Sequence, residues 1–369
     1  VMVEVTLNSS SGNNVTTDDL MCWASATDPD GGFLQYYGFW YKNGVQWFYQ
    51  KELQEGGSNS DRAFGVAFDV NDNIVVVGST ASYGSGGSDA WILKYDSQGN
   101  LLWQTTAGGP DSDHAYDVAI DLTSNSIVAV GSTAYPPGNP PQIWVLKYDP
   151  DGNLLWNKTF NLGDEAMGVA IDNDGNIIVV GYGFNHSTFT YDAVILKLDP
   201  NGNLIWSDVR GWAYVDDYFY GVAAFPNNDI VVVGFTTSSG NGNAWILKYD
   251  EDGNLLWQTT VGGTDYDSAY DVAVDYDRNV VIAGSTASYG SGGSDAWILK
   301  YDNQGNLLWQ TTAGGPDWDY ANGIDVDSEN DIIVVGSIYN STTNSDDMWI
   351  MKFNSSGSMV WNCLLYTSP

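Results

Sequence analysis

The sequence predicts an all-β protein that contains six copies of one four-stranded unit. Three markers recur in step along the chain: a Trp after a Gly-Asn-Leu-Leu phrase, a Lys inside an Ile-Leu-Lys-Tyr-Asp phrase, and a Gly after a Val-Val-Val run, each phrase recurring in related forms. The Trp markers lie 50 to 53 residues apart and are Trp103, Trp156, Trp206, Trp257, Trp309 and Trp361. Between the markers, short β-branched runs alternate with Gly, Asn and Asp, which is typical of strands and turns. A repeat of about fifty residues with four strands predicts the blade of a β-propeller.

The first copy illustrates the four expected strands. We expect them at Phe64–Asp69, Ile74–Ser79, Ala90–Tyr95 and Leu101–Thr106. The connections 69–73 and 96–100 are short and rich in Asp, Asn and Gly, so they predict tight turns between antiparallel neighbours. Small residues in the first strand suit a crowded axis, and the large Trp of the fourth strand suits a wide rim. We therefore expect the first strand to be innermost and the fourth outermost.

Two charged residues recur as regularly as the Trp. Six of the twelve basic residues are the Lys markers, which are Lys94, Lys147, Lys197, Lys248, Lys300 and Lys352. An Asp recurs ahead of each first strand, at Asp61, Asp113, Asp164, Asp217, Asp267 and Asp319. Because an unpaired buried charge is costly, each Lys is expected to bond a carboxylate or backbone carbonyls, with this Asp set as the first choice. The alternative is that the Asp ring holds a cation or a ligand at one rim.

The chain on either side of the repeats has a different character. Thr27-Asp28-Pro29-Asp30-Gly31 and Trp40-Tyr41-Lys42-Asn43-Gly44 resemble part of an immunoglobulin- or cadherin-like surface module. Residues 1–50 therefore predict a partial β-sandwich-like segment, in which Asp28 and Asp30 are candidate Ca²⁺ ligands by resemblance. The propeller is expected over 51–362. Residues 363–369 resemble a translated sequencing adaptor and are expected to be a non-native tail.

The repeat also resembles a known family. Gly65-Val66-Ala67-Phe68-Asp69, Asn73–Gly78, Asp89–Asp96 and Leu101–Gly109 are similar to the secreted bacterial and archaeal family often called seven-bladed β-propeller repeats. The resemblance covers Gly56 to Trp361. It implies a propeller of an extracellular or cell-surface protein, with six blades visible and a seventh allowed in a longer protein. It implies little about biochemical function.

The charge of the chain excludes some partners. Its 46 acidic and 12 basic residues give a formal charge of −34. Nucleic-acid and anionic-lipid binding need clustered Lys and Arg, so neither is expected, although some carboxylates could hold Ca²⁺. No apolar run reaches the roughly 18 residues of a membrane helix. Six Asn-x-Ser/Thr sites fit a secreted glycoprotein, at Asn8, Asn14, Asn157, Asn185, Asn340 and Asn354.

Catalytic residues are scarce. The two histidines are His114 and His186, which lie in different copies on predicted loops. Neither a Ser-His-Asp triad nor a metal site with several histidines is therefore expected. The repeated Trp is similar to the docking motif of quinoprotein propellers, but it is expected to pack blades together. We therefore expect no catalysis. The alternatives are an extracellular propeller enzyme acting on polysaccharide, or a quinoprotein-like relative.

Any ligand is expected on one face of the propeller. The connections between second and third strands, and between successive copies, are long and variable, whereas the others are tight turns. The long connections carry the aromatic residues Tyr83, Tyr135, Phe184, Trp212, Tyr214, Tyr218, Tyr289 and Trp318. Such residues suit recognition of a carbohydrate or a protein, and the alternative is that they pack the loops together. The sequence thus favours a surface module for adhesion, binding or scaffolding.

Overall fold

The computed structural model describes residues 22–27, 35–42, 45–48, 56–134, 140–212, 214–238 and 240–365, the first three ranges as backbone. The chain divides into two units, Val1–Glu55 and Gly56–Pro369. In the first unit, an antiparallel sheet contains β1 (Cys22–Thr27), β2 (Gln35–Lys42) and β3 (Val45–Phe48). Asp28, Asp30 and Tyr135 lie outside the described residues, and the immunoglobulin- or cadherin-like character of residues 1–50 stays a prediction.

The second unit is a β-propeller whose blades are numbered here in chain order. Blade 1 contains β4 (Asp61–Phe68), β5 (Ile74–Thr80), β6 (Asp89–Tyr95) and β7 (Leu101–Ala107). Blade 2 contains β8 (His114–Asp121), β9 (Ser126–Thr133), β10 (Gln142–Tyr148) and β11 (Leu154–Phe160). Blade 3 contains β12 (Glu165–Ile171), β13 (Ile177–Asn185), β14 (Thr190–Leu198) and β15 (Leu204–Arg210).

The remaining three blades repeat the same plan. Blade 4 contains β16 (Asp217–Ala224), β17 (Ile230–Thr236), β18 (Asn243–Tyr249) and β19 (Leu255–Val261). Blade 5 contains β20 (Asp267–Val274), β21 (Val280–Thr286), β22 (Asp295–Tyr301) and β23 (Leu307–Ala313). Blade 6 contains β24 (Asp319–Val326), β25 (Ile332–Asn340), β26 (Ser345–Phe353) and β27 (Met359–Leu365). The expected non-native tail therefore begins within β27. A seventh blade in a longer protein stays a prediction.

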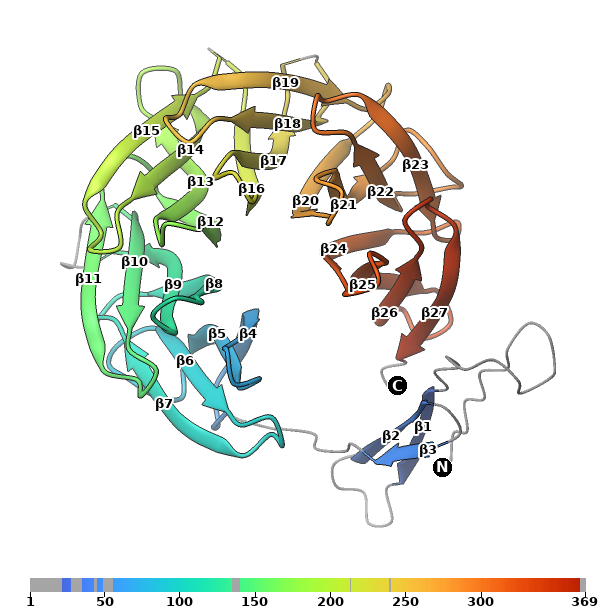
Figure 1. The fold of residues 1–369 in the computed structure, drawn as a ribbon, viewed down its shortest axis with the longest axis horizontal. Coiled ribbons are helices and arrows are strands. Elements are labelled where there is room, and N and C mark those ends of the chain that lie inside the picture. Colours follow the sequence, from blue (N-terminus) through green and yellow to red (C-terminus); the bar gives the residue numbers. More distant parts are fainter. Residues whose placement is uncertain are drawn as a thin grey trace. The chain divides into compact units, whose positions relative to one another are not determined.

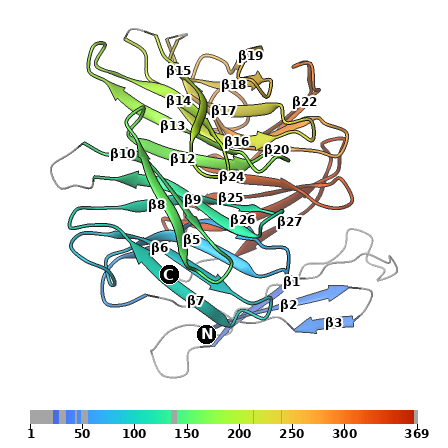
Figure 2. The same ribbon diagram turned by 60° about the vertical axis from the view of Figure 1, so that its left-hand side comes forward.

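Each blade is an antiparallel meander in which the strands pair in chain order. The first strand of each blade is innermost and the fourth lies at the rim, which confirms the predicted arrangement (Figure 1). The first strands of successive blades pack against one another from β4 to β24. Viewed from another side, the strands of each blade twist relative to one another, as β-sheets do (Figure 2).

The predicted start of the first strand was wrong. Strand β4 begins at Asp61, three residues before the expected Phe64, and Asp61 pairs with Thr80. A register shift between Ala63 and Gly65 interrupts the ladder, so the alternation of side chains breaks at that point. The same shift occurs in every blade, and the strand continues through it.

The hydrophobic core lies between neighbouring blades. Val75 and Ile92 of blade 1 form one buried cluster with Val118 and Trp144 of blade 2. Among the described residues, the outward face of blade 1 has no such cover: Val66, the counterpart of Val118, is 59% exposed against 5%. Burial between blades is therefore what converts a row of similar sheets into a cooperative unit.

Candidate functional site

A three-part contact joins most neighbouring blades near the rim. In blade 1, Lys94 Nζ lies 2.8 Å from Asp69 Oδ2 and donates to the carbonyl oxygen of Pro150 in blade 2 at 3.0 Å. Trp103 Nε1 donates to the same carbonyl at 3.1 Å. Gly152 lies against the indole, where a Cβ would stand 2.7 Å from Trp103 Cδ2. We call this set the rim contact: a Lys and a Trp that share one carbonyl of the next blade.

The rim contact recurs at other junctions. Lys197 and Trp206 share the carbonyl of Glu251, and Lys300 and Trp309 share that of Ser355. Trp257 donates to the Asn303 carbonyl, and Lys248 donates to the Asn303 side chain. The predicted bracing of the lysines is thus confirmed.

The predicted carboxylate partner of the lysines was wrong. Their ion-pair partners are Asp69, Asp121, Asp172, Asp229, Asp275 and Asp327, and none of these belongs to the regular Asp set. The reason is the direction of the strands. Lys94 pairs with Val75, near the turn that joins β4 to β5, whereas Asp61 pairs with Thr80 at the opposite end of that hairpin.

The regular Asp residues instead organise the long loops. Asp61 accepts hydrogen bonds from Thr80 Oγ1 at 2.5 Å, Ser82 Oγ at 2.7 Å and Gly57 N at 2.8 Å. Although burial opposes it, these bonds lower the pKa of Asp61 to about 2. Asp267 repeats the arrangement with Gly263, Thr286 and Ser288. Asp113 and Asp319 likewise accept from the backbone of Gly109 and Gly315, Asp164 from Phe184 and Asp217 from Trp212. This set therefore acts as a loop brace.

Two carboxyl groups that the sequence reasoning missed bridge blades near the axis. Asp117 accepts from Val118 N and from Val169 N of the next blade, both at 2.8 Å. Asp271 does the same with Val272 N and Ile324 N. Burial raises the pKa of Asp117 to about 7 and that of Asp271 to about 6. The sequence contains a signal for these two carboxyl groups, because the other four copies have Gly at the position that Asp117 and Asp271 occupy.

The predicted aromatic residues fall into two groups. Phe184 and Tyr218 belong to an aromatic cluster that crosses blades 3 to 5. Its ring centroids are 5.3 Å apart for Phe184 and Tyr191, 5.5 Å for Tyr191 and Tyr218, 5.9 Å for Tyr218 and Tyr220, and 6.0 Å for Tyr220 and Tyr270. These contacts favour the packing interpretation for Phe184 and Tyr218.

The second group remains exposed, in the connections of several blades. Tyr83 rests on Trp91 with centroids 5.6 Å apart, and its hydroxyl donates to the Gly56 carbonyl at 2.9 Å. Tyr289 has the same support from Trp297 and Gly262. Trp212 lies 5.2 Å from the Trp245 ring, Trp318 lies 6.1 Å from Tyr339, and Tyr214 is 88% exposed. The supported rings combine an accessible face with a fixed orientation.

The two histidines occupy different settings. His114 is the first residue of β8, not a loop residue as predicted, and its ring stacks on Tyr116. Burial lowers the pKa of His114. His186 lies in the turn between β13 and β14, as predicted. Among the described residues, no group of three His, Cys, Asp or Glu could hold a metal ion. Within the same residues, no helix is long and apolar enough to span a membrane.

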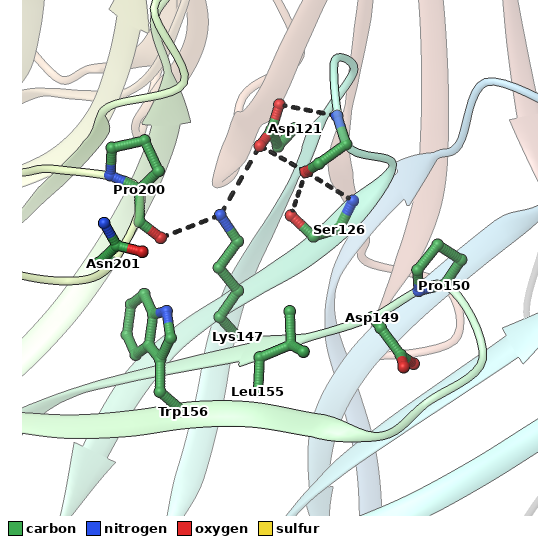
Figure 3. A pocket seen from close by; sticks show the side chains of 10 residues that line it. Asp121, Ser126, Lys147, Asp149, Pro150, Leu155, Trp156, Pro200 and Asn201 are labelled. Atoms are coloured by element: carbon green, nitrogen blue, oxygen red, sulfur yellow. Dashed lines mark hydrogen bonds and ion pairs between the residues drawn. The ribbon is translucent and has the colours of Figure 1, made fainter.

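A cavity lies on the face opposite the long loops, between blades 2 and 3. Its volume is about 380 Å³. It is lined by the turns that follow β8, β10 and β14 together with the start of β11. Lys147 points into it, with its ammonium between the Asp121 carboxylate and the Pro200 carbonyl (Figure 3). This cavity was not predicted from the sequence, because tight turns were expected to make this face uniform.

Comparison with known proteins assigns the family. Residues 88–363 match the PQQ-type repeat family described as outer membrane protein assembly factor BamB, and the chain belongs to this family. An uncharacterized WD repeat-containing protein of Acanthamoeba polyphaga mimivirus is 30% identical over 32% of this chain, which spans 9% of that protein.

Solved structures show the same fold at low identity. A protein of unknown function from Bacteroides caccae superimposes with a TM-score of 0.50 and 14% identity, over 76% of this chain and 92% of its own. PorZ of Porphyromonas gingivalis, described as an essential bacterial surface component of the type-IX secretion system, gives a TM-score of 0.52 and 13% identity. That match covers 94% of this chain and 50% of PorZ.

Proposed function

We propose that this chain is a non-catalytic binding module of an extracellular or cell-surface protein. It binds a carbohydrate or protein ligand on the face of the long loops. The observation that carries the proposal is the set of exposed aromatic rings held in fixed orientations, of which Tyr83 and Tyr289 are the clearest. A rigid aromatic ring gives contact area at a low entropic cost. The description of PorZ as a bacterial surface component supports this location.

The carboxylates support binding rather than catalysis. A general acid needs a raised pKa and a free approach to substrate. Asp117, Asp217 and Asp271 have raised pKa values, but their carboxyl groups accept hydrogen bonds from backbone N–H groups. The regular Asp residues serve as loop braces. This use of the acids argues against the polysaccharide-enzyme alternative.

Two observations argue against the quinoprotein alternative. Four of the repeated Trp residues, Trp103, Trp206, Trp257 and Trp309, donate to the neighbouring blade, so the motif is already used for packing. The inner strands carry Asp117 and Asp271, and a quinone with several carboxylates would be repelled by them where they ionise. Negative charge at these two positions would disfavour an anionic quinone near the axis.

The test is to apply the purified protein to a glycan array and to candidate surface proteins, with a panel of hydrolase and dehydrogenase substrates in parallel. Trp212→Ala with Trp318→Ala should weaken retention at least about fivefold without unfolding, since central aromatic contacts cost more than about 1 kcal/mol when truncated. Tyr276→Ala, an exposed ring on the opposite face, is the matched control. Turnover of any substrate that is abolished by one carboxylate change would overturn the proposal.

A further inference from the structure

The junction between blades 2 and 3 departs from the other rim contacts. Lys147 Nζ lies 3.6 Å from Asp121 Oδ2, whereas the matching distance is 2.8 or 2.9 Å in every other blade. The turn from Asp121 to the first residue of the next apolar run is one residue longer than in the other blades. It presents the hydroxyls of Ser124 and Ser126, where blade 1 has Asn73 hydrogen-bonded to Asp69.

The indole ring of Trp156, at this junction, is oriented differently from the repeated Trp rings at the other junctions. In the other junctions of the described chain, the Trp Nε1 donates to a carbonyl of the next blade, from Trp103, Trp206, Trp257 and Trp309. Trp156 makes no such bond within these residues. Gly202 faces Cη2 and Cζ3 of Trp156, whereas Gly152 faces Cδ2 of Trp103. Lys158 Nζ instead donates to the Asn201 carbonyl at 2.8 Å, and it lies 5.6 Å from the indole centroid.

The turned indole forms one wall of the cavity of about 380 Å³. Figure 3 shows Trp156 and Asn201 on one side of Lys147, with Asp149 and Pro150 on the other. Apolar surface comes from Trp156, Leu155 and the two prolines, and polar groups come from carboxylates, hydroxyls and an amide. The wall therefore combines an aromatic plane with hydrogen-bonding groups of both kinds.

We propose that this cavity binds one neutral pyranose unit of a glycan. A sugar ring has an apolar C–H face, which suits an indole, and a rim of hydroxyls that both donate and accept hydrogen bonds. The volume lies at the lower end of the range for small-molecule sites. An anion is disfavoured, because Asp121 already neutralises the Lys147 ammonium and Asp149 adds a second negative charge. The site is separate from the loop face, and this proposal does not depend on the proposed function.

The test uses methyl glycosides of neutral hexoses and N-acetylhexosamines, with methyl glucuronide as the anionic comparison, in saturation-transfer NMR titrations of the whole chain. We expect a neutral glycoside to saturate at millimolar concentration, and the glucuronide to bind more weakly. Trp156→Phe keeps an aromatic ring and removes the N–H donor, so affinity should fall about 2- to 12-fold, the equivalent of one hydrogen bond. The melting temperature should fall only slightly, because the change removes some packing against the core but no inter-blade hydrogen bond.

The matched control is Trp206→Phe, whose N–H donates to the Glu251 carbonyl at 3.0 Å. This change should lower the melting temperature and leave glycoside affinity unchanged. The proposal is overturned if no neutral glycoside binds with a dissociation constant below about 50 mM, which corresponds to a binding free energy of less than about 2 kcal/mol. It is also overturned if Trp156→Phe binds like wild type, or destabilises as Trp206→Phe does. Loss of binding only in the Trp212→Ala, Trp318→Ala protein would assign the sugar to the loop face instead.

Discussion

Replacing Lys197 by Met should destabilise the propeller far more than replacing Lys158 by Met. Lys197 is buried between blades 3 and 4, 2.9 Å from Asp172, and the two side chains are 4% and 0% exposed. It also donates to the Glu251 carbonyl at 3.1 Å. Lys158, on strand β11, is only half-buried, and its ammonium donates to neutral oxygens of Asn201 and Asn203.

The expected loss in the free energy of unfolding depends on the Asp172 charge that stays buried after Lys197 is replaced. Removing one partner of a buried ion pair costs about 3–5 kcal/mol, because the other charge stays buried without compensation. Asp172 would keep its bonds from Asn176 N at 2.8 Å and Asp174 N at 3.0 Å, so we expect about 3 kcal/mol. Lys158→Met removes a hydrogen bond to neutral acceptors and leaves no charge buried, so it should cost only about 0.5–1.5 kcal/mol.

The measurement is urea unfolding of both variants, with calorimetry as the check that the transition is two-state. Adding Asp172→Asn to Lys197→Met removes the stranded charge while retaining a turn acceptor, so it should recover part of the loss. Equal stabilities for Lys197→Met and Lys158→Met would refute the reasoning. So would a double variant less stable than Lys197→Met alone, since the stranded charge would then not be the cause.

Two further changes test the axis of the propeller. Because burial raises the pKa of Asp117 to about 7, the folded chain holds a proton that the unfolded chain has released above about pH 4, so stability should fall as pH rises from 4 to 7. Asp117→Asn should flatten that slope in melting curves taken between pH 4 and 8, and an unchanged slope would contradict the assignment. Gly221→Ala would place a Cβ 2.8 Å from Asp271 Cα and should cost about 1–3 kcal/mol in urea unfolding. Gly315→Ala, with a nearest neighbour at 3.9 Å, should cost less, and equal losses would be evidence against crowding at the axis.

The repeat made most of the fold predictable. Six markers of each kind set the number of blades, and the tight Asp-rich turns set the order of the strands. The start of the first strand was missed because a bulge breaks the alternation on which such predictions depend, as at Phe64 in blade 1.

The candidate sites were less predictable, because they depend on side-chain direction. The Lys94 partner could not be read from the sequence without knowing which end of the hairpin the side chain reaches. Trp156 follows the same Gly-Asn-Leu-Leu phrase as Trp103, so nothing in that motif indicates a turned ring. The available signal is Lys158, which stands where blade 1 has Thr105.

The order of residues at the axis, which is Gly, Asp, Gly, Gly, Asp and Gly in blades 1 to 6, also limits how this chain can change by duplication. An added Cβ at Gly65 would stand 2.9 Å from Asp117 Cα, and Asp117 itself reaches across to Val169 of the next blade. A blade with Asp at this position therefore needs a glycine-bearing blade before it. Copying blade 2 or blade 5 beside itself would place an Asp where that glycine is required. New blades could therefore be gained by unequal recombination only where each blade with Asp follows a blade with Gly at this position. Neighbouring repeats must then be inherited as pairs that meet this condition.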